Sequence, residues 1–550
     1  MHESSTLITA PTTPMIWHGW GDPTRRPGLS PRAEALLAQE IGPLDRHTPP
    51  VPLEEVRVGP SALSDDDRRA LEAIVGPDRV LDDHLTRVRH AGGKSYPDLF
   101  RRRQGDAVAA PDAVVLPGSH EEVAAVLAVA AERGVAVVPF GGGTSVVGGV
   151  EPERGGFDSL IALDLARMDR LVTLDEESLL ATFEPGIRGP EAEAELRRRG
   201  YSLGHFPQSY AYASIGGYVA TRSAGQASTG HGRIDQLVHA VRVATPIGEL
   251  SAGVSPATAA GPDLRQVVVG SEGLLGVITE ATLRIHHAPE VEVYEAHAVR
   301  SFTEGAAILR ELVQAGVAPD VCRLSDVDET RTFVQQTEGV KGTALRGYLS
   351  LRGYGEGCLL ILGWDGSRAS VALGRAAAAR VLRGHETLRL GTRPGDAWAH
   401  GRFDGPYLRD ELMDRGVMVE TLETATTWSA IPRLYGAVRR ALHDALGDRG
   451  TPPLVLCHIS HVYPSGCSLY YTWIARQDQG DELAQWRAAK AAASEAILAA
   501  GGTITHHHAV GTDHRPYMTA EVGDVGVSLL RALKDAVDPT GILNPGKLVP

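Results

Sequence analysis

Cysteine is scarce in this chain of 550 residues, which contains four cysteines and no CxxC pair. Because disulfide-stabilised secreted domains are rich in cysteine, we expect a reduced, cytoplasmic protein whose thiols are buried. The sequence also lacks a run of about 20 apolar residues and a basic N-terminal segment followed by an apolar one, so we expect neither a membrane-spanning helix nor a secretory signal. The C-terminal residues LVP do not form a peroxisomal address.

An excess of positive charge is missing as well. The chain has 54 Lys and Arg against 68 Asp and Glu, which gives a formal net charge of -14. Proteins that bind nucleic acid usually carry a basic excess or a basic stripe, so we exclude nucleic acid as a partner. The share of apolar residues, 43%, is ordinary for a globular protein, and the length predicts more than one domain.

The periodicity of apolar residues and the placement of glycine and proline divide the chain into four regions. They are a loop-rich N-terminal arm with a small helical region (1–95), a domain of alternating strands and helices (96–288), a domain that mixes strands with long helices (289–480), and a C-terminal helical segment (481–550). We therefore predict an α+β protein.

Several helices have clear end signals. The stretch LSDDDRRALEAIVG has Ser64 ahead of its acidic first turn and Gly76 behind it, and SHEEVAAVLAVAAERG lies between Ser119 and Gly134. We also predict a helix in ELAQWRAAKAAASEAILAAGG and another in LLRALKDAV, which Pro539 stops. These helices flank strand candidates such as VAVVPF and CLLILGWD.

The first motif with chemical meaning is PFGGGTS, which directly follows a predicted strand. It comprises Pro139, Phe140, Gly141, Gly142, Gly143, Thr144 and Ser145. Consecutive glycines let backbone N–H groups approach an anion closely, and a diphosphate is the ligand that such a loop suits. The spacings of the Rossmann motif and of the P-loop are both absent, and a glycine triplet alone is more often a plain turn.

Three further motifs follow in order. The run from 205 to 238 is rich in small and hydroxyl-bearing residues, which permit close backbone contact with a flat ligand and its phosphate chain. The run GSEGLLGVITEATLRI (270–285) is an apolar segment interrupted by glycines, and DPTGILNPGK (538–547) lies near the C-terminus. A polar loop explains any one of these residues, but it explains the whole set poorly.

Together, the four ordered motifs resemble those of FAD enzymes of the vanillyl-alcohol-oxidase class. The resemblance implies a PCMH-type FAD-binding domain over 96–288, a cap domain that binds substrate over 289–480, and a C-terminal segment that completes the active site. It places the FAD diphosphate on the PFGGGTS motif. Because this motif contains no histidine for the usual covalent link, we expect FAD to be bound non-covalently. The other implied cofactor contacts are Gln208, Ser209, Ser214, Gly216, Gly217, Thr221, Arg222, Ser223, Ala224, Glu272, Gly273, Leu274, Leu275, Gly276, Val277 and Ile278.

Within that class, the chain resembles the alkylglycerone-phosphate synthase (alkyl-dihydroxyacetonephosphate synthase) family, from WHGWGDP near the start to the C-terminal tail. The most telling stretch is THHHAVG (505–511). The resemblance implies a non-redox transferase that exchanges the acyl group of acyl-dihydroxyacetone-phosphate for a fatty alcohol, a homodimer, and contact with a membrane surface. The alternatives are an FAD-dependent oxidoreductase acting on a 2-hydroxy acid, an alcohol or another small molecule, and a flavin-binding protein without activity.

The resemblance also assigns roles to individual residues. Tyr470 matches the tyrosine that moves the substrate proton, and His205 matches a histidine required for activity. Arg409 matches the arginine that binds substrate, and its planar guanidinium suits a phosphate. Arg323 matches an arginine near the active site, and Thr421 stands where animal members of the family have serine. Tyr471 should face the opposite side of its strand from Tyr470 and serve the structure.

The histidine triplet His506, His507 and His508 permits two interpretations. Three consecutive side chains cannot all point the same way, so the triplet alone makes a poor mononuclear metal site, and we expect no metal. A catalytic loop fits better, because imidazoles exchange protons near neutral pH. The resemblance supports the same role in acid–base catalysis.

Overall fold

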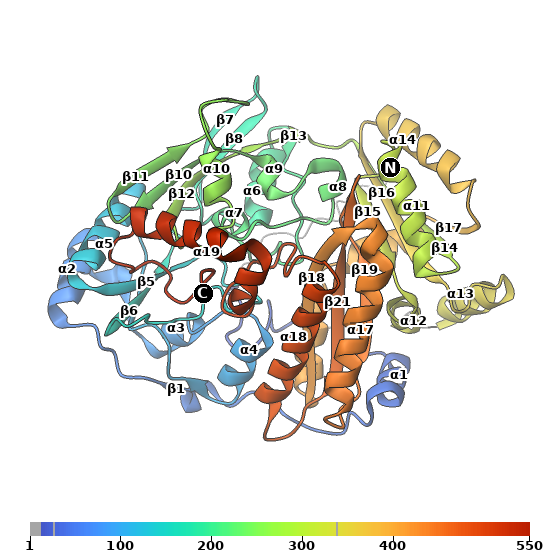
Figure 1. Cartoon of the computed structure of the whole chain (residues 1–550), viewed down its shortest axis with the longest axis horizontal. Helices are drawn as coiled ribbons and strands as arrows, with labels where there is room; N and C mark the ends of the chain where they lie inside the picture. The colour runs from blue at the N-terminus through green and yellow to red at the C-terminus, as the bar shows by residue number, and fades with distance from the viewer. Residues whose placement is uncertain (1–10, 12, 26–27, 337–338) are drawn as a thin grey trace.

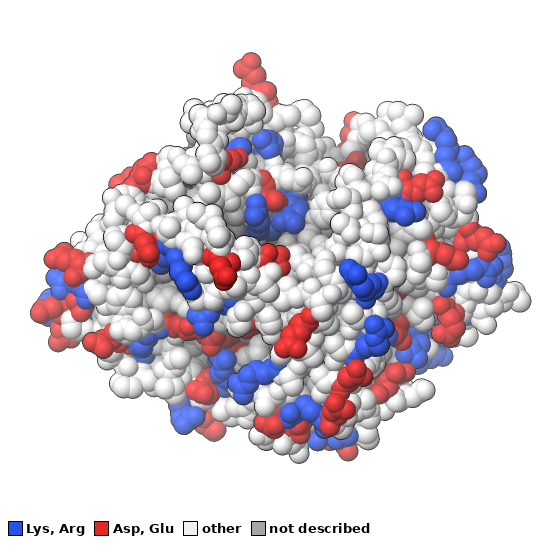
Figure 2. Space-filling view, in the orientation of Figure 1, with Lys and Arg blue, Asp and Glu red and all other residues white. Residues whose placement is uncertain are grey.

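The computed structural model describes residues 11–550 except 12, 26–27 and 337–338, so residues 1–10 of the expected N-terminal region (1–95) lie outside it (Figure 1). The fold is α+β, as predicted. A first domain holds a four-stranded and a five-stranded sheet, a cap domain holds one larger sheet, and two further sheets, β1-β3 and β13-β9, have two strands each. All four cysteines are free and buried, as expected. On the face in Figure 2, basic and acidic side chains are interspersed, without a basic stripe.

One sheet of the first domain carries the PFGGGTS loop at its end. Its order is β2-β4-β6-β5, in which β4, β6 and β5 are parallel. The strands are β2 (Val80–Leu81), β4 (Ala113–Val115), β5 (Val135–Phe140) and β6 (Ser159–Asp164). Helix α5 (His120–Arg133) joins β4 to β5 and buries its Val123, Val126 and Leu127 in the core below the sheet. Its N-cap is Ser119 and its C-cap is Gly134, as predicted.

The second sheet of this domain is antiparallel, in the order β11-β10-β12-β8-β7. Its strands are β7 (Leu171–Asp175), β8 (Leu180–Phe183), β10 (Val238–Thr245), β11 (Gly248–Ala252) and β12 (Val277–Arg284). The short helix α7 (Ile215–Thr221) contacts β12. The C-terminal tail returns to this domain, where Leu543 pairs with Val137 of β5. The tail motif DPTGILNPGK therefore contributes to the first domain.

The cap sheet has the order β17-β14-β16-β15-β19-β21-β18, and β20 (Val462–Tyr463) pairs with β21. Its strands are β14 (Val291–Val299), β15 (Val321–Ser325), β16 (Cys358–Gly366), β17 (Thr387–Gly391), β18 (Val417–Thr427), β19 (Leu454–Ile459) and β21 (Gly466–Arg476). One face packs on α11 (Phe302–Gln314), α14 (Arg368–Leu382), α17 (Ile431–Gly447) and α18 (Glu482–Ala499). The other face turns toward the first domain.

Alternation along the cap strands decides which side chains face the helices. Leu324, Cys457 and Tyr471 lie in the core beneath the helices, whereas their neighbours Arg323, His458 and Tyr470 line a cavity on the opposite face. The expected opposition of Tyr470 and Tyr471 is thus confirmed. The Tyr471 hydroxyl donates to the Leu434 carbonyl, which is a structural contact.

The other predicted helices are present, with one difference in extent. Helix α2 (Asp65–Val75) has Ser64 and Gly76 as its caps, and α18 follows the predicted stretch. Helix α19 (Met518–Val537) ends before Pro539 but begins well before the predicted LLRALKDAV segment. Gly523, which has φ 73°, kinks the helix and interrupts the helical periodicity of the sequence, so the part before it was not predicted. Within the described ranges, no helix is both long and apolar enough to cross a membrane.

Candidate active site

A cavity of about 590 Å³ lies between the first domain and the cap sheet. One wall consists of the PFGGGTS loop, the run from 207 to 226 and the start of β12. The other wall consists of side chains from β15, β18, β19 and β21. Segments that are more than three hundred residues apart in the sequence thus meet around one space, which is the usual form of a site for a cofactor and its substrate.

Most of the residues predicted to contact the cofactor line this cavity. They are Pro139, Phe140, Gly141, Gly142, Gly143, Thr144, Ser145, Gln208, Ser209, Ser214, Gly216, Gly217, Thr221, Ser223, Ala224, Glu272, Gly273, Gly276, Val277 and Ile278. The structure places Arg222, Leu274 and Leu275 elsewhere. Arg222 donates to Gln266 Oε1 at 2.6 Å, and Leu274 packs in a small core with Val510 and Met518. These three residues therefore do not line the cavity.

The PFGGGTS loop presents unused hydrogen-bond donors to the cavity. Among the described residues, no acceptor pairs with the backbone N–H groups of Gly141 through Ser145. Gly143 is buried and the other four residues are half-buried in the cavity wall, so this row of N–H groups is available to a ligand with acceptor oxygens. Gly142 packs so closely on Tyr212 that a Cβ would overlap the Tyr212 carbonyl oxygen. The loop therefore fits a diphosphate such as that of FAD.

Glu272 connects the cofactor wall to the loop that follows the histidine triplet. Its carboxylate accepts hydrogen bonds from the backbone N–H groups of Val510 and Gly511, each at 2.8 Å. The Asn544 side chain donates to the Glu272 carbonyl oxygen at 2.6 Å. Burial raises the pKa of the Glu272 carboxyl to about 7, although the two backbone donors oppose the rise. Glu272 thus both lines the cavity and anchors the triplet loop.

We expect Glu272→Gln to flatten the dependence of stability on pH. The folded protein holds the Glu272 proton more tightly than the unfolded chain, so this carboxyl destabilises the fold as pH rises from 4.5 to about 7. The full difference is about 3 kcal/mol. Thermal midpoints across this window should fall in the wild type and fall less in the variant. Glu280→Gln, a half-buried residue of β12 whose carboxylate pairs with Arg242, is the control, and equal slopes for wild type and Glu272→Gln would contradict the assignment.

Tyr470 lies in the cavity wall among imidazoles. Its ring stacks on His458, with 4.7 Å between centroids, and meets the ring of His508 edge-on at 5.5 Å. Burial raises the pKa of Tyr470, and a hydrogen bond with Thr421 partly opposes that rise. Burial lowers the pKa of His508 to about 3 and also lowers the pKa of His458. At neutral pH the site therefore holds a protonated tyrosine beside neutral imidazoles.

Arg323 is held in place by an acidic partner. Its guanidinium contacts Glu329 Oε1 at 3.0 Å, and the same oxygen lies 2.8 Å from Nδ1 of His458. Although burial favours the neutral acid, His458 and Arg323 hold the pKa of Glu329 at about 2. The Glu329 carboxylate thus fixes Arg323 and the His458 ring together, and the latter supports Tyr470 by stacking.

Arg409 brings positive charge to the cavity on α16 (Gly405–Met413). One guanidinium nitrogen donates to the Lys94 carbonyl oxygen at 2.7 Å, and another lies 3.5 Å from Asp410. No described residue accepts a hydrogen bond from its buried Nε. The guanidinium is therefore oriented by its partners and keeps donor capacity for an anion.

Two of the predicted catalytic histidines do not line the cavity. His205 is buried, contacts Ser223 Oγ at 3.0 Å through Nε2, and packs on Tyr218. Burial lowers its pKa to about 3, so it is neutral at physiological pH. Since Ser223 does line the cavity, His205 is placed to act through that residue. His506 lies behind the wall, whereas His507 and His508 face the cavity.

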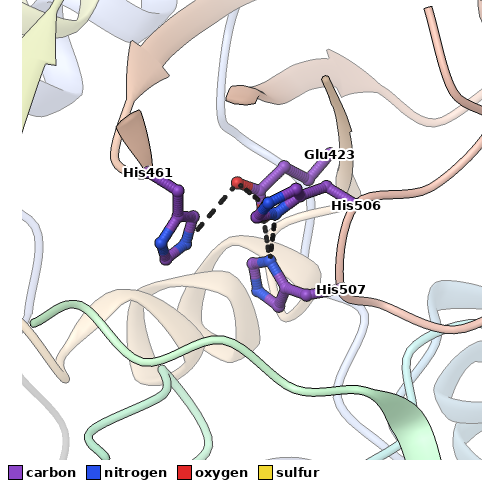
Figure 3. Close-up of side chains that lie close together, drawn as sticks. All are labelled: Glu423, His461, His506 and His507. Carbon is purple, nitrogen blue, oxygen red and sulfur yellow. Dashed lines mark hydrogen bonds and ion pairs between the residues drawn. The ribbon is translucent and has the colours of Figure 1, made fainter. Parts of the chain in front are cut away.

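The first two residues of the triplet, His506 and His507, approach a buried carboxylate (Figure 3). His507 Nδ1 lies 2.5 Å from Glu423 Oε2, and His506 Nδ1 lies 3.5 Å from Glu423 Oε1. The backbone N–H of His506 donates to the Glu423 carbonyl oxygen at 3.0 Å. Burial alone would raise the pKa of Glu423, but His507 and its neighbours hold it well below the usual range.

The cavity also has an apolar end. It is lined by Leu29, by Ala33 and Leu37 of α1 (Pro31–Ile41), and by Leu412, Val419, Leu456 and Ile474 of the cap domain. Val419 and Ile474 of this group lie on the strands that also carry Thr421 and Tyr470. This end suits a hydrocarbon chain.

Sequence reasoning missed Glu423, His458 and His461 at this site. His458 could have been found, because strand alternation in LVLCHIS places it opposite the buried Cys457. Glu423 and His461 gave no local signal. They are close to the triplet because its loop runs along β18, where the backbone N–H of His506 donates to the Glu423 carbonyl oxygen, and because His461 lies in a turn that is hydrogen-bonded to β21.

Comparisons with known proteins agree with this geometry. Residues 111–252 match the FAD binding domain family, and residues 288–548 match the family of C-terminal domains of FAD linked oxidases. These matches confirm that the chain is an FAD protein. They begin near the strands that open the first domain and the cap domain.

The full-length relatives are more specific. The chain is 32% identical to an alkyldihydroxyacetonephosphate synthase of Dictyostelium discoideum, over 97% of this chain and 93% of the relative. A solved structure of an alkyldihydroxyacetonephosphate synthase superimposes with a TM-score of 0.84 at 31% identity, covering 97% of this chain and 99% of the other. The structure of p-cresol methylhydroxylase, at 17% identity and a TM-score of 0.67 over 89% of this chain and 98% of the other, shares the fold. The expected PCMH-type fold is confirmed.

Proposed function

The chain belongs to the alkyldihydroxyacetonephosphate synthase family of FAD enzymes, and from this membership we propose that it forms the ether bond of an ether-lipid precursor. The reaction exchanges the fatty acid of acyl-dihydroxyacetone-phosphate for a fatty alcohol. The products are alkyl-dihydroxyacetone-phosphate and a free fatty acid, and no electrons are gained or lost overall. Because both substrates carry long hydrocarbon chains, we also propose contact with a membrane surface.

One observation carries this proposal: a single cavity combines an arginine, a tyrosine among imidazoles and an apolar end. Arg409 supplies charge for a phosphate, and the residues from α1 and the cap strands supply apolar surface for a chain. Tyr470 lies on the same strand as Ile474 of the apolar end, four residues away. A substrate with a phosphate at one end and a hydrocarbon chain at the other matches this distribution.

The protein's part in the reaction is binding and proton transfer. Arg409 holds the phosphate, and Tyr470 takes the proton from the carbon beside the ketone. Since the pKa of Tyr470 is raised, the tyrosine can take that proton only if its own proton passes to a neighbour. The imidazoles of His508 and His458 lie in ring contact with Tyr470 and are the neighbouring bases. Because burial lowers the pKa of both, the negative charge of the bound substrate would have to favour their protonation before either takes that proton. Bound FAD supplies the reactive ring system at which the two substituents are exchanged.

Replacing Arg409 should weaken the binding of phosphate-bearing substrate about ten- to hundredfold, because a charged hydrogen bond contributes roughly 1.5–3 kcal/mol. We expect KM to rise in Arg409→Ala, and also in Arg409→Lys, which loses the two-pronged geometry. FAD content should not change. Arg415→Ala, just beyond the same helix, removes a guanidinium that pairs with Glu34 and Glu411 outside the cavity, and it is the control. Unchanged KM in both Arg409 variants would refute the role.

The proposed function is tested by incubating the purified protein with acyl-dihydroxyacetone-phosphate and labelled fatty alcohol, without an electron acceptor. Label should appear in an alkali-stable ether product, in equal amount to the fatty acid released. Release of fatty acid without label in the lipid product would indicate hydrolysis. The absence of both products, together with oxidation of a hydroxy acid when an acceptor is added, would favour an oxidoreductase on the same fold.

A further inference from the structure

Four side chains converge in the cavity wall in an arrangement that the proposed function does not use (Figure 3). Glu423 comes from β18, His461 from the turn between β19 and β20, and His506 and His507 from the loop after α18. One ligand atom of each lies within 4.8 Å of those of the other three. Three imidazoles and one carboxylate form a typical donor set for a transition metal.

The outer ring nitrogens of two histidines are held by hydroxyl groups. His461 Nδ1 lies 2.6 Å from Ser228 Oγ, and His506 Nε2 lies 2.7 Å from the Tyr463 hydroxyl. When such an outer N–H donates to oxygen, the inner nitrogen carries the lone pair. This outward hydrogen bond is how proteins orient histidines that bind metals. The inner nitrogens, His461 Nε2 and His506 Nδ1, are those that face Glu423, at 3.7 Å and 3.5 Å.

Glu423 provides an independent observation. Its side chain is 1% exposed, and neither of its oxygens accepts a well-directed hydrogen bond from a described residue, although imidazole nitrogens lie close by. A buried carboxylate without such bonds is costly, and buried charges are usually paired or bound to a metal. Glu423 thus supplies one anionic oxygen ligand beside three imidazole nitrogens, a set that a divalent cation would complete.

We propose that Glu423, His461, His506 and His507 bind one divalent first-row transition-metal ion, with zinc as the expected occupant. The three nitrogen donors disfavour magnesium and calcium, which prefer oxygen ligands. This departs from the expectation drawn from the triplet alone. The sequence alone offered three consecutive histidines whose side chains cannot all point the same way. In the structure, two of the three, His506 and His507, lie beside Glu423 and His461 from other elements.

The ion would lie in the wall of the cavity, because His461 and His507 line the cavity while Glu423 and His506 lie behind it. It would hold the triplet loop against β18, and it would leave His508 free beside Tyr470. Metal binding is thus separable from proton transfer at Tyr470, and the inference stands whether or not the proposed ether-forming reaction is correct.

The test is metal content measured against flavin. The flavin-loaded protein is stripped with a chelator, exposed to Zn²⁺ or Co²⁺, freed of excess ion and analysed by elemental mass spectrometry. We expect one metal ion per flavin in the wild type, and visible ligand-field bands with Co²⁺ in the difference spectrum against the stripped protein. Glu423→Gln and His461→Asn should lose the ion, and Ser228→Ala should bind it ~10-fold more weakly.

Two controls make the result decisive. His508→Asn changes the third residue of the triplet, which is not among the proposed ligands, and it should keep one ion per flavin. Flavin content and the thermal midpoint show whether each variant is folded. If Glu423→Gln does not fold, His461→Asn alone tests the loss of the ion. Wild-type protein that keeps its flavin but retains neither ion would overturn the proposal. Loss of the ion from His508→Asn to the same extent as from His461→Asn would also overturn it.

Discussion

Tyr470→Phe is expected to lower turnover by ~10²–10⁴, which is the range for losing a general acid or base. The substitution removes only the hydroxyl, which is the group that faces the cavity between Thr421 and His508. Ring stacking on His458 is retained, so folding and FAD binding should survive. The measurement is kcat for ether formation, together with the release of deuterium from the carbon beside the ketone.

The control for this substitution is the next residue. Tyr471→Phe removes a hydroxyl on the opposite face of β21, where it bonds to the Leu434 carbonyl oxygen in the core. It should leave turnover unchanged apart from a small loss of stability. If Tyr470→Phe kept full turnover and full deuterium release, proton transfer would have to be assigned to another group in the cavity.

Gly142→Val is expected to weaken FAD binding at least ~100-fold, since overpacking of this kind costs about 3 kcal/mol. The new side chain would meet the Tyr212 carbonyl oxygen and push the PFGGGTS loop away from the run that contains Ser214. The row of N–H groups from Gly141 to Ser145 would then no longer converge on a diphosphate. Equilibrium dialysis of the apoprotein with FAD measures the effect.

Gly447→Val is the matched control, because a Cβ there meets open space at the end of α17. It should bind FAD as the wild type does. The flavin itself should be released by acid precipitation, in keeping with the expected non-covalent binding. Wild-type affinity in Gly142→Val would show that the diphosphate lies elsewhere, and flavin colour retained by the washed precipitate would contradict non-covalent binding.

Local signals in the sequence predict the helices and the faces of strands well. Ser119 and Gly134 limit α5 because a hydroxyl and a left-handed glycine satisfy the free backbone groups at helix ends. Tyr470 and Tyr471 separate to opposite faces because side chains alternate along a strand. The role of the PFGGGTS loop was predictable only from the set of four ordered motifs, because a glycine triplet alone is more often a plain turn.

Features that depend on the pairing of distant segments were not predictable. Glu423 and His461 meet the triplet only after three segments of the cap and C-terminal regions come together, and no spacing in the sequence encodes this. His205 contacts Ser223 instead of the cavity, because the loop that carries it folds behind α7. The first part of α19 was missed because Gly523 interrupts its helical pattern.

The central claim is that this enzyme joins an alkyl chain to dihydroxyacetone phosphate on FAD without net oxidation or reduction. An anaerobic titration tests it most directly: acyl-dihydroxyacetone-phosphate is added first, fatty alcohol second, and the flavin spectrum is recorded throughout. We predict repeated turnover to the ether product, with the oxidised flavin spectrum restored each time and no acceptor present. Stoichiometric, persistent bleaching of the flavin by a hydroxy acid, with no ether product from the lipid pair, would contradict the claim.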